Sequence, residues 1–103
     1  MHKNTLSIII PCKNEEESII KMVTALIKAI KHINFEIVLI NDFSTDKTQY
    51  IIKKLSNDTK GVFSYNNINS GIGHAIELGI NKSSGDFLAI MMADSSDDPN
   101  DLI

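Results

Sequence analysis

Three groups of polar residues directly follow apolar runs, and their side chains could bind a ligand or a cation. They are residues 11–15 (Pro-Cys-Lys-Asn-Glu), 41–44 (Asn-Asp-Phe-Ser) and 94–99 (Asp-Ser-Ser-Asp-Asp-Pro). The carboxylate of Asp94 is a hard oxygen ligand of the kind that Mg²⁺ or Mn²⁺ prefers, and such a cation would bridge phosphate oxygens. The carboxylate of Asp42 could accept hydrogen bonds from the base or sugar of a nucleoside.

Each group also has a structural interpretation. Residues 94–98 could begin a helix with their carboxylates as caps, and we expect this role for the last two aspartates, which stand before a proline. Asp42 could be a cap or turn residue ahead of the next helix. In the first group, Asn14 is predicted to cap the following helix, with Glu17 completing a capping-box-like pair, whereas Glu15 is predicted to face the ligand.

The hydrophobic pattern predicts four strands and three helices in alternation. The strands are expected at residues 6–10, 36–40, 61–65 and 86–92. The first, second and fourth are continuous β-branched or bulky runs, which is typical of strands covered on both faces of a parallel sheet. Alternation of this kind predicts an α/β fold with right-handed crossovers.

Apolar residues at helical spacing locate the three helices. A first helix presents one buried stripe, made of Ile19, Val23, Leu26, Ile30 and Ile33. A second is predicted to start at residue 44 or 45, with an aspartate in its first turn, and to stop before residue 57. The third is expected over residues 73–81.

The predicted topology brings the polar groups together. Ligands of an open parallel sheet bind beyond the carboxyl ends of the strands, where the strand order reverses. If the fourth strand returns beside the first, the order is 3-2-1-4. Asp42, Asp94 and residues 11–15 would then line one crevice.

Composition excludes several classes of protein. The chain has 103 residues, which is enough for one core, and its net charge is −3 with no arginine, so a nucleic-acid-binding protein is not expected. The single cysteine, Cys12, forms no internal disulfide, and the apolar runs are far shorter than a membrane span. Because the first residues also lack a signal-peptide pattern, we predict a cytoplasmic domain with no transmembrane segment in this chain.

Three further features could suggest a catalytic or binding role but are given a structural interpretation. Residues 71–73 (Gly-Ile-Gly) lack the third glycine of a dinucleotide-binding loop and follow the third strand, so they are interpreted as a turn that begins the third helix. His74 is predicted to be either a surface residue or one that supports the residues of the site from behind. Cys12 has no base nearby in the sequence and is predicted to be a small strand-end residue, not a nucleophile.

Four blocks of the sequence, taken together, resemble the family 2 glycosyltransferases with the GT-A fold. Residues 7–16 resemble the opening strand with its Pro-x-x-Asn-Glu motif, and residues 36–48 the strand followed by Asp-Asp and Ser-x-Asp-x-Thr. Residues 69–86 resemble the third block. Residues 91–99 resemble the metal-binding segment, most closely that of the polyprenol-phosphate (dolichol-phosphate-mannose-synthase-like) branch. The resemblance covers nearly the whole chain.

The resemblance implies a Rossmann-like, mostly parallel sheet and transfer of a sugar from a UDP- or GDP-linked donor. It also implies Mg²⁺ or Mn²⁺ at the diphosphate, with Asp94 as the metal ligand, and points to a lipid-phosphate acceptor at the cytoplasmic face of the membrane. It places seven residues at the nucleotide sugar, namely Pro11, Lys13, Glu15, Ile40, Asp42, Ala93 and Asp94.

Two departures from the family pattern leave a second hypothesis open. Met92 stands where the metal segment commonly has its first acidic residue. The family's domain also continues well beyond this length, so residues 1–103 are expected to form the donor-binding N-terminal half of one GT-A domain, inactive by itself. The alternatives are a complete four-stranded domain and, for the function, a non-catalytic nucleotide- or nucleotide-sugar-binding module.

Overall fold

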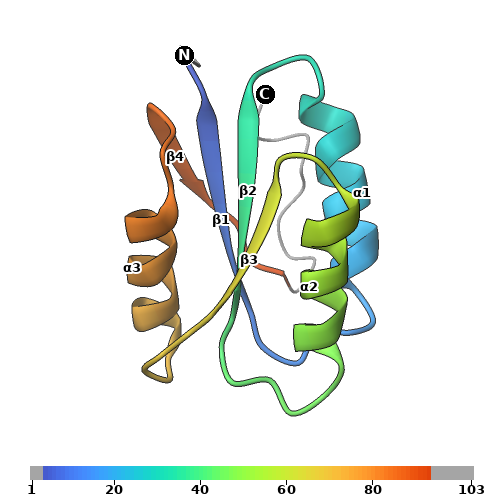
Figure 1. Cartoon of the computed structure of the whole chain (residues 1–103), viewed down its shortest axis with the longest axis vertical. Helices are drawn as coiled ribbons and strands as arrows, with labels where there is room; N and C mark the ends of the chain where they lie inside the picture. Colours follow the sequence, from blue (N-terminus) through green and yellow to red (C-terminus); the bar gives the residue numbers. More distant parts are fainter. Residues whose placement is uncertain (1–3, 94–103) are drawn as a thin grey trace.

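Strands and helices alternate along the chain, as the hydrophobic pattern predicts. The computed structural model describes residues 4–93. Its elements are β1 (Leu6–Cys12), α1 (Ile19–Ile30), β2 (Phe35–Asn41), α2 (Thr48–Asp58), β3 (Val62–Asn66), α3 (Ile72–Lys82) and β4 (Phe87–Ile90). All strand pairs are parallel and the order is β3-β2-β1-β4, which confirms the predicted order 3-2-1-4 (Figure 1).

Helices cover both faces of the sheet, with α1 and α2 on one face and α3 on the other (Figure 1). Alternate residues of β1 therefore enter two different cores. Ile8 and Ile10 pack with the α1 stripe, and Ile9 packs with residues of β2 and α3. Four members of the predicted stripe are buried, from Ile19 to Ile30, whereas Ile33 follows the end of α1 and is half-buried against the same core.

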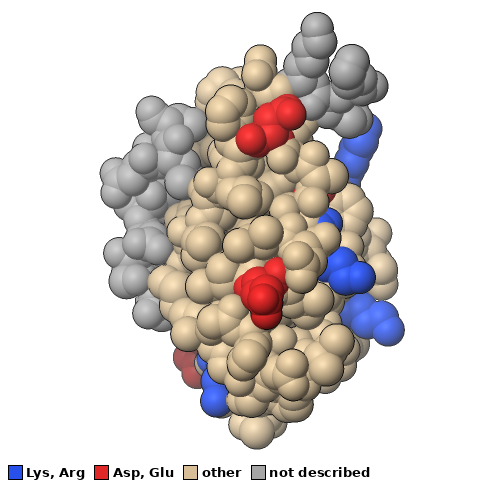
Figure 2. Space-filling view, turned by 90° about the vertical axis from the view of Figure 1, so that its left-hand side faces the viewer, with Lys and Arg blue, Asp and Glu red and all other residues tan. Residues whose placement is uncertain are grey.

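The central strands are covered as predicted, but β4 is not. Within the described residues, Phe87, Leu88 and Ile90 are 58%, 50% and 48% exposed. The prediction of a fourth strand covered on both faces is therefore wrong, because β4 lies at the edge of the sheet and α3 packs over β1 and β2 instead. The side of the molecule formed by α3 and β4 also carries few charged side chains (Figure 2).

The helices of the described part are short. They contain 12, 11 and 11 residues, whereas a helix needs about 20 apolar residues to cross a bilayer. No helix within residues 4–93 is long and apolar enough to span a membrane.

Candidate functional site

A cleft of about 310 Å³ opens at the carboxyl ends of β1 and β2. It is lined by residues from the loops after both strands, from the start of α3 and from the segment after β4, namely Pro11, Cys12, Lys13, Glu15, Asp42, Gly71, Ile72 and Met92. Four of the seven predicted donor-binding residues thus lie together: Pro11, Lys13, Glu15 and Asp42. The strand order explains the meeting, because parallel strands present their carboxyl ends at one edge of the sheet.

Two of the other three predicted residues, Ile40 and Ala93, do not line this cleft. Ile40 is fully buried and packs in the core beneath α3. Ala93 is also buried, and its carbonyl oxygen accepts a hydrogen bond from the Ser18 hydroxyl at 3.0 Å. Asp94 lies outside the described residues, so its place in the site stays a prediction.

Hydrogen bonds join the loop after β1 to the loop after β2. Three consecutive backbone N–H groups, those of residues 14–16, donate to three side chains spaced two residues apart. The bonds are Asn14 N–H to Ser44 Oγ (3.0 Å), Glu15 N–H to Thr48 Oγ1 (2.8 Å) and Glu16 N–H to Asp46 Oδ2 (3.3 Å). The Ser-x-Asp-x-Thr spacing therefore has a physical purpose, since it fixes the backbone that carries Lys13 and Glu15 at the cleft.

The predicted cap at Asn14 is wrong. Its backbone has φ 54°, and its side-chain Oδ1 accepts the Thr45 N–H at 2.7 Å, so Asn14 belongs to the joined loops and not to a helix. α1 begins four residues after the expected start, with Ser18 at the N-cap position and no side-chain capping bond. Glu17 accordingly completes no capping box.

The second helix also starts later than predicted, at Thr48. The carboxylate of Asp46 precedes the helix and accepts both the N–H and the hydroxyl of Thr48, which turns the chain into α2. Desolvation acts to raise the pKa of Asp46, but the hydrogen bonds from Thr48 and from the Glu16 N–H outweigh it. The pKa of this carboxyl therefore lies below its usual value of 3.8.

Cys12 is a structural residue, as predicted. It ends β1, is fully buried, and its thiol donates to the Ile10 carbonyl at 3.3 Å. Burial, followed by the nearby charge of Glu15, raises the pKa of Cys12 to about 12, so its nucleophilic thiolate is scarce at neutral pH. His74 is exposed on the first turn of α3, also as predicted.

Asp42 is buried and holds the loop between β3 and α3. Its Oδ1 accepts the Asn67 side-chain amide at 3.0 Å and the Gly71 backbone N–H at 3.0 Å. Asp42 therefore does not cap α2, whose N-cap position belongs to Lys47. No donor within residues 4–93 reaches its second oxygen, Oδ2, and no fully buried side-chain oxygen there lacks a partner. Oδ2 therefore retains some exposure, and Asp42 as a residue lines the cleft.

Sequence reasoning missed two residues of this arrangement, Asn67 and Gly71. Gly71 stands at the N-cap position of α3 with φ 123°, a conformation that side chains disfavour. The Gly-Ile-Gly motif was the available signal for the turn. Nothing in the sequence pairs Asn67 with Asp42, because 25 residues separate them.

The comparisons with known proteins agree with this fold and site. The sequence model of Glycosyl transferase family 2 matches residues 7–103. The chain belongs to this family. It is 30% identical over 103 residues to the undecaprenyl-phosphate 4-deoxy-4-formamido-L-arabinose transferase of Proteus mirabilis, covering 96% of this chain and 32% of the relative. It is 30% identical over 94 residues to the dolichol-phosphate mannosyltransferase of Pyrococcus furiosus, covering 91% and 27%.

Solved structures confirm the GT-A fold of this family 2 chain. TarS 1–349 of S. aureus, in complex with UDP-GlcNAc, superimposes with a TM-score of 0.75 at 26% identity, covering 87% of this chain and 26% of TarS. The glucosyl-3-phosphoglycerate synthase of Mycobacterium tuberculosis has a TM-score of 0.69 at 22% identity, covering 88% and 33%, and supports the fold alone. The family 2 chain spans about a third of the length of the curated relatives it matches.

The described part of the family 2 chain contains no ready metal centre. Within residues 4–93, no group of three histidine, cysteine, aspartate or glutamate side chains is placed to hold a metal ion. Met92 lines the cleft at the position where the resemblance expects an acidic residue. Asp94 lies outside the described residues, so its role as a metal ligand stays a prediction.

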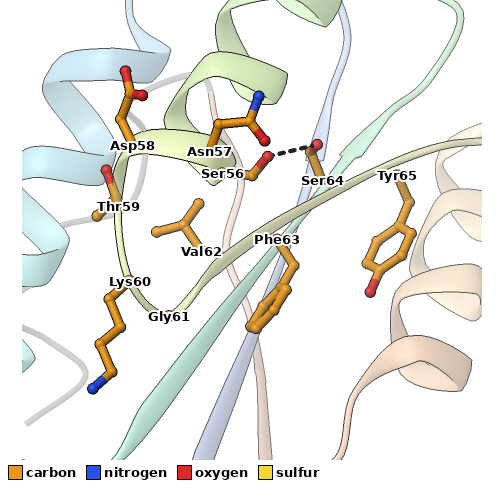
Figure 3. Close-up of a pocket in the computed structure, with 10 residues that line it drawn as sticks. All are labelled: Ser56, Asn57, Asp58, Thr59, Lys60, Gly61, Val62, Phe63, Ser64 and Tyr65. Carbon is orange, nitrogen blue, oxygen red and sulfur yellow. Dashed lines mark hydrogen bonds between the residues drawn. The ribbon is translucent and has the colours of Figure 1, made fainter.

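Two larger hollows in the described part do not have the character of a functional site. One, of about 620 Å³, is lined by the single run 56–65 along the edge strand β3, where Ser56 and Ser64 hydrogen-bond at 3.1 Å and Asp58 and Lys60 point outward (Figure 3). The other, of about 790 Å³, lies at the amino ends of the strands. There, Glu36 is occupied by hydrogen bonds from serine residues of β1 and of the turn before β4.

Proposed function

We propose that this chain is the donor-binding N-terminal part of a glycosyltransferase, and that the cleft at the carboxyl ends of β1 and β2 binds the nucleotide of a UDP- or GDP-linked sugar. The observation that carries the proposal is the convergence of Pro11, Lys13, Glu15 and Asp42 on one cleft. Two separate segments of the chain supply them, since Pro11, Lys13 and Glu15 lie at and after the end of β1 and Asp42 directly follows β2.

The chemistry of the lining suits a nucleoside diphosphate. The Asp42 carboxylate can only accept hydrogen bonds, so it would bind an N–H or O–H of the base or ribose. Lys13 is exposed at the rim, where its ammonium group can approach an anionic phosphate. The cleft volume is at the lower end of the usual range for ligand pockets, about 300–1,000 Å³, and fits a nucleotide better than a whole donor.

A divalent cation completes the proposal, with Asp94 as its predicted ligand. Bound at the diphosphate, Mg²⁺ or Mn²⁺ would neutralise the negative charge that develops on the leaving group. The chain's own contribution is to fix the segment before this aspartate, because the Ser18 hydroxyl holds the Ala93 carbonyl.

The acceptor is proposed from the relatives. The Proteus mirabilis and Pyrococcus furiosus proteins are named for undecaprenyl phosphate and dolichol phosphate, and a polyprenol phosphate is accordingly the acceptor class we propose. Such an acceptor would bring the enzyme to the cytoplasmic face of a membrane. Because this chain matches only about a third of each relative, we expect the acceptor site and any catalytic base to be supplied by residues outside this chain.

An amide NMR titration with UDP and with GDP, each with and without Mg²⁺, tests the donor site. We expect shifts of the amide signals of residues 12–15, 42 and 71 with one of the two nucleotides, strengthened by Mg²⁺. The groove lined by residues 56–65 serves as an internal control and should not respond. A dispersed spectrum with no response to either nucleotide would refute the proposal.

A non-catalytic nucleotide-binding module is the second candidate, favoured by Met92 at the cleft. The two candidates differ in their need for metal. The Asp94→Asn variant should lose the Mg²⁺ enhancement of UDP or GDP affinity if the chain belongs to a metal-dependent transferase. Tight binding without metal, unchanged in Asp94→Asn, would favour the module.

A further inference from the structure

Asn67 is the residue through which β3 reaches the cleft. It directly follows the strand, and its backbone N–H continues the β2–β3 pairing by donating to the Asn41 carbonyl at 2.8 Å. The residue is 8% exposed, against 5% for Asp42. Their contact is therefore a hydrogen bond between two buried polar side chains, in which a lost partner is costly.

Every polar atom of the Asn67 side chain is engaged. The Nδ2 group donates to Asp42 Oδ1 at 3.0 Å and to the Gly71 carbonyl at 3.3 Å, and Oδ1 accepts the Ile68 N–H at 3.0 Å. Two acceptors and one donor surround this side chain, so its position requires an amide. A carboxylate of the same shape would face the Asp42 carboxylate with no proton to donate.

In the same network, the two oxygens of the Asp42 carboxylate have different roles, because only Oδ1 accepts hydrogen bonds from Asn67 and Gly71. Asn67 and the Gly71 N–H both donate to Oδ1, which fixes the rotation of the carboxylate plane. Oδ2 has no donor within residues 4–93 and is not fully buried, and Asp42 lines the cleft. A group held in this way needs no reorganisation when a ligand arrives.

We propose that Asn67 is a positioning residue for nucleotide binding: with the Gly71 N–H it holds Oδ1 of Asp42, so that Oδ2 faces the cleft and accepts a hydrogen bond from the donor nucleoside. This inference rests on the proposed function. Asn67 does not line the cleft itself, so its effect on binding passes through Asp42 and through the loop that begins α3.

The test is a double-mutant cycle on nucleotide affinity, measured by calorimetry with Mg²⁺ and whichever of UDP and GDP the wild-type chain binds. Asp42→Asn keeps an oxygen for Asn67 and Gly71 but replaces the accepting Oδ2 with a donor. Asn67→Ser removes the amide. Each single variant should weaken binding about tenfold or more. The double variant should bind no more weakly than Asp42→Asn alone, because the two residues act through one interaction.

Controls separate positioning from loss of structure. Asn69→Ser makes the same substitution on the same loop, at an exposed position, and should leave affinity within about twofold. Amide spectra and urea unfolding confirm that each variant is folded. If Asn67→Ser does not fold, Asn67→Gln replaces it, since this variant keeps the amide but displaces it by one methylene.

The outcomes distinguish the two proposals. If the wild-type chain binds neither UDP nor GDP, the proposed function fails and the role of Asn67 with it. If the wild type binds and Asn67→Ser binds equally well, only the role of Asn67 is refuted. Additive losses in the cycle would also refute it, because they would show that Asn67 acts independently of Asp42.

Discussion

The packing of α3 against the sheet predicts that one substitution, glycine to alanine, has opposite effects at two positions of the same helix. Gly79 is buried where α3 crosses β1, and a Cβ added there would lie 2.4 Å from Cγ2 and 3.2 Å from Cγ1 of Ile9. Gly73 lies on the first turn of α3, and a Cβ there would have nothing within 4 Å. Gly73→Ala is therefore the matched control for Gly79→Ala.

The magnitude follows from the room available. Carbon atoms in contact are normally about 3.5–4.0 Å apart, so the new methyl group must push Ile9 or α3 away by more than about 1 Å. Ile9 cannot turn aside, because it is β-branched, fully buried and paired with Val38 and Ile90 on its two neighbouring strands. Overpacking of this kind costs about 1–3 kcal/mol, against a helix-propensity gain of about 1 kcal/mol.

We expect Gly79→Ala to lower the free energy of unfolding by up to about 2 kcal/mol, and Gly73→Ala to leave it unchanged or raise it by up to about 1 kcal/mol. Urea unfolding of the 103-residue chain, followed by far-UV circular dichroism, measures both. The melting temperature of Gly79→Ala should fall by several degrees. If Gly79→Ala stabilises the chain as much as Gly73→Ala does, α3 does not pack on Ile9 as described.

Three further predictions concern the loops at the cleft. Thr48→Val leaves the Glu15 N–H without its acceptor and should lower the free energy of unfolding, measured in urea, by about 1–3 kcal/mol. Thr48→Ser keeps the hydroxyl and should cost less than about 1 kcal/mol. Equal losses would contradict the role of the hydroxyl. Folding lowers the pKa of Asp46, so the ionised carboxylate stabilises the folded chain above pH 3.8, and this stabilisation is lost as the pH falls through the lower pKa of the folded state. The difference in free energy of unfolding between wild type and Asp46→Asn should therefore narrow only at acidic pH. The pKa of Cys12 is raised to about 12 from 9.0, so the free energy of unfolding should decline as the pH rises above 9. At pH 8, iodoacetamide should alkylate Cys12 at least about a hundredfold more slowly in the folded chain than in the urea-unfolded chain. Equal rates would show that the thiol is not buried.

Most of the fold could be predicted from the sequence because it depends on apolar periodicity, which is a local signal. The alternation of elements, the strand order and the buried stripe of α1 follow from hydrophobic runs and from the rules of parallel sheets. The exposure of β4 could not be predicted in this way. A continuous apolar run indicates a strand that suits burial on both faces, but whether a neighbour covers it depends on which strand lies at the edge.

The starts of the helices were harder to predict, because polar side chains there have more than one partner within reach. Asn14 and Asp46 both have the residue types that cap helices, and the sequence assigned each to the helix that follows it. In the fold, Asn14 instead accepts the Thr45 N–H of the other loop. Asp46 accepts the Glu16 N–H across the loops as well as the local hydrogen bonds from Thr48. Helix capping is predicted from neighbouring residues. A competing partner about 30 residues away in the sequence leaves no sign in such a local pattern.

The residues of the candidate site could be predicted only in part, also because some of their hydrogen-bond partners are distant in the sequence. Pro11, Lys13, Glu15 and Asp42 were predicted because they stand at strand ends, where the topology concentrates ligand contacts. Asn67 also stands at a strand end, but the end of the third strand was not among the predicted ligand-binding groups. Asn67 does not line the cleft, and it contacts the cleft through hydrogen bonds to Asp42 and Gly71. Residues that act through another residue leave no signature of type and spacing, and only the folded geometry pairs them.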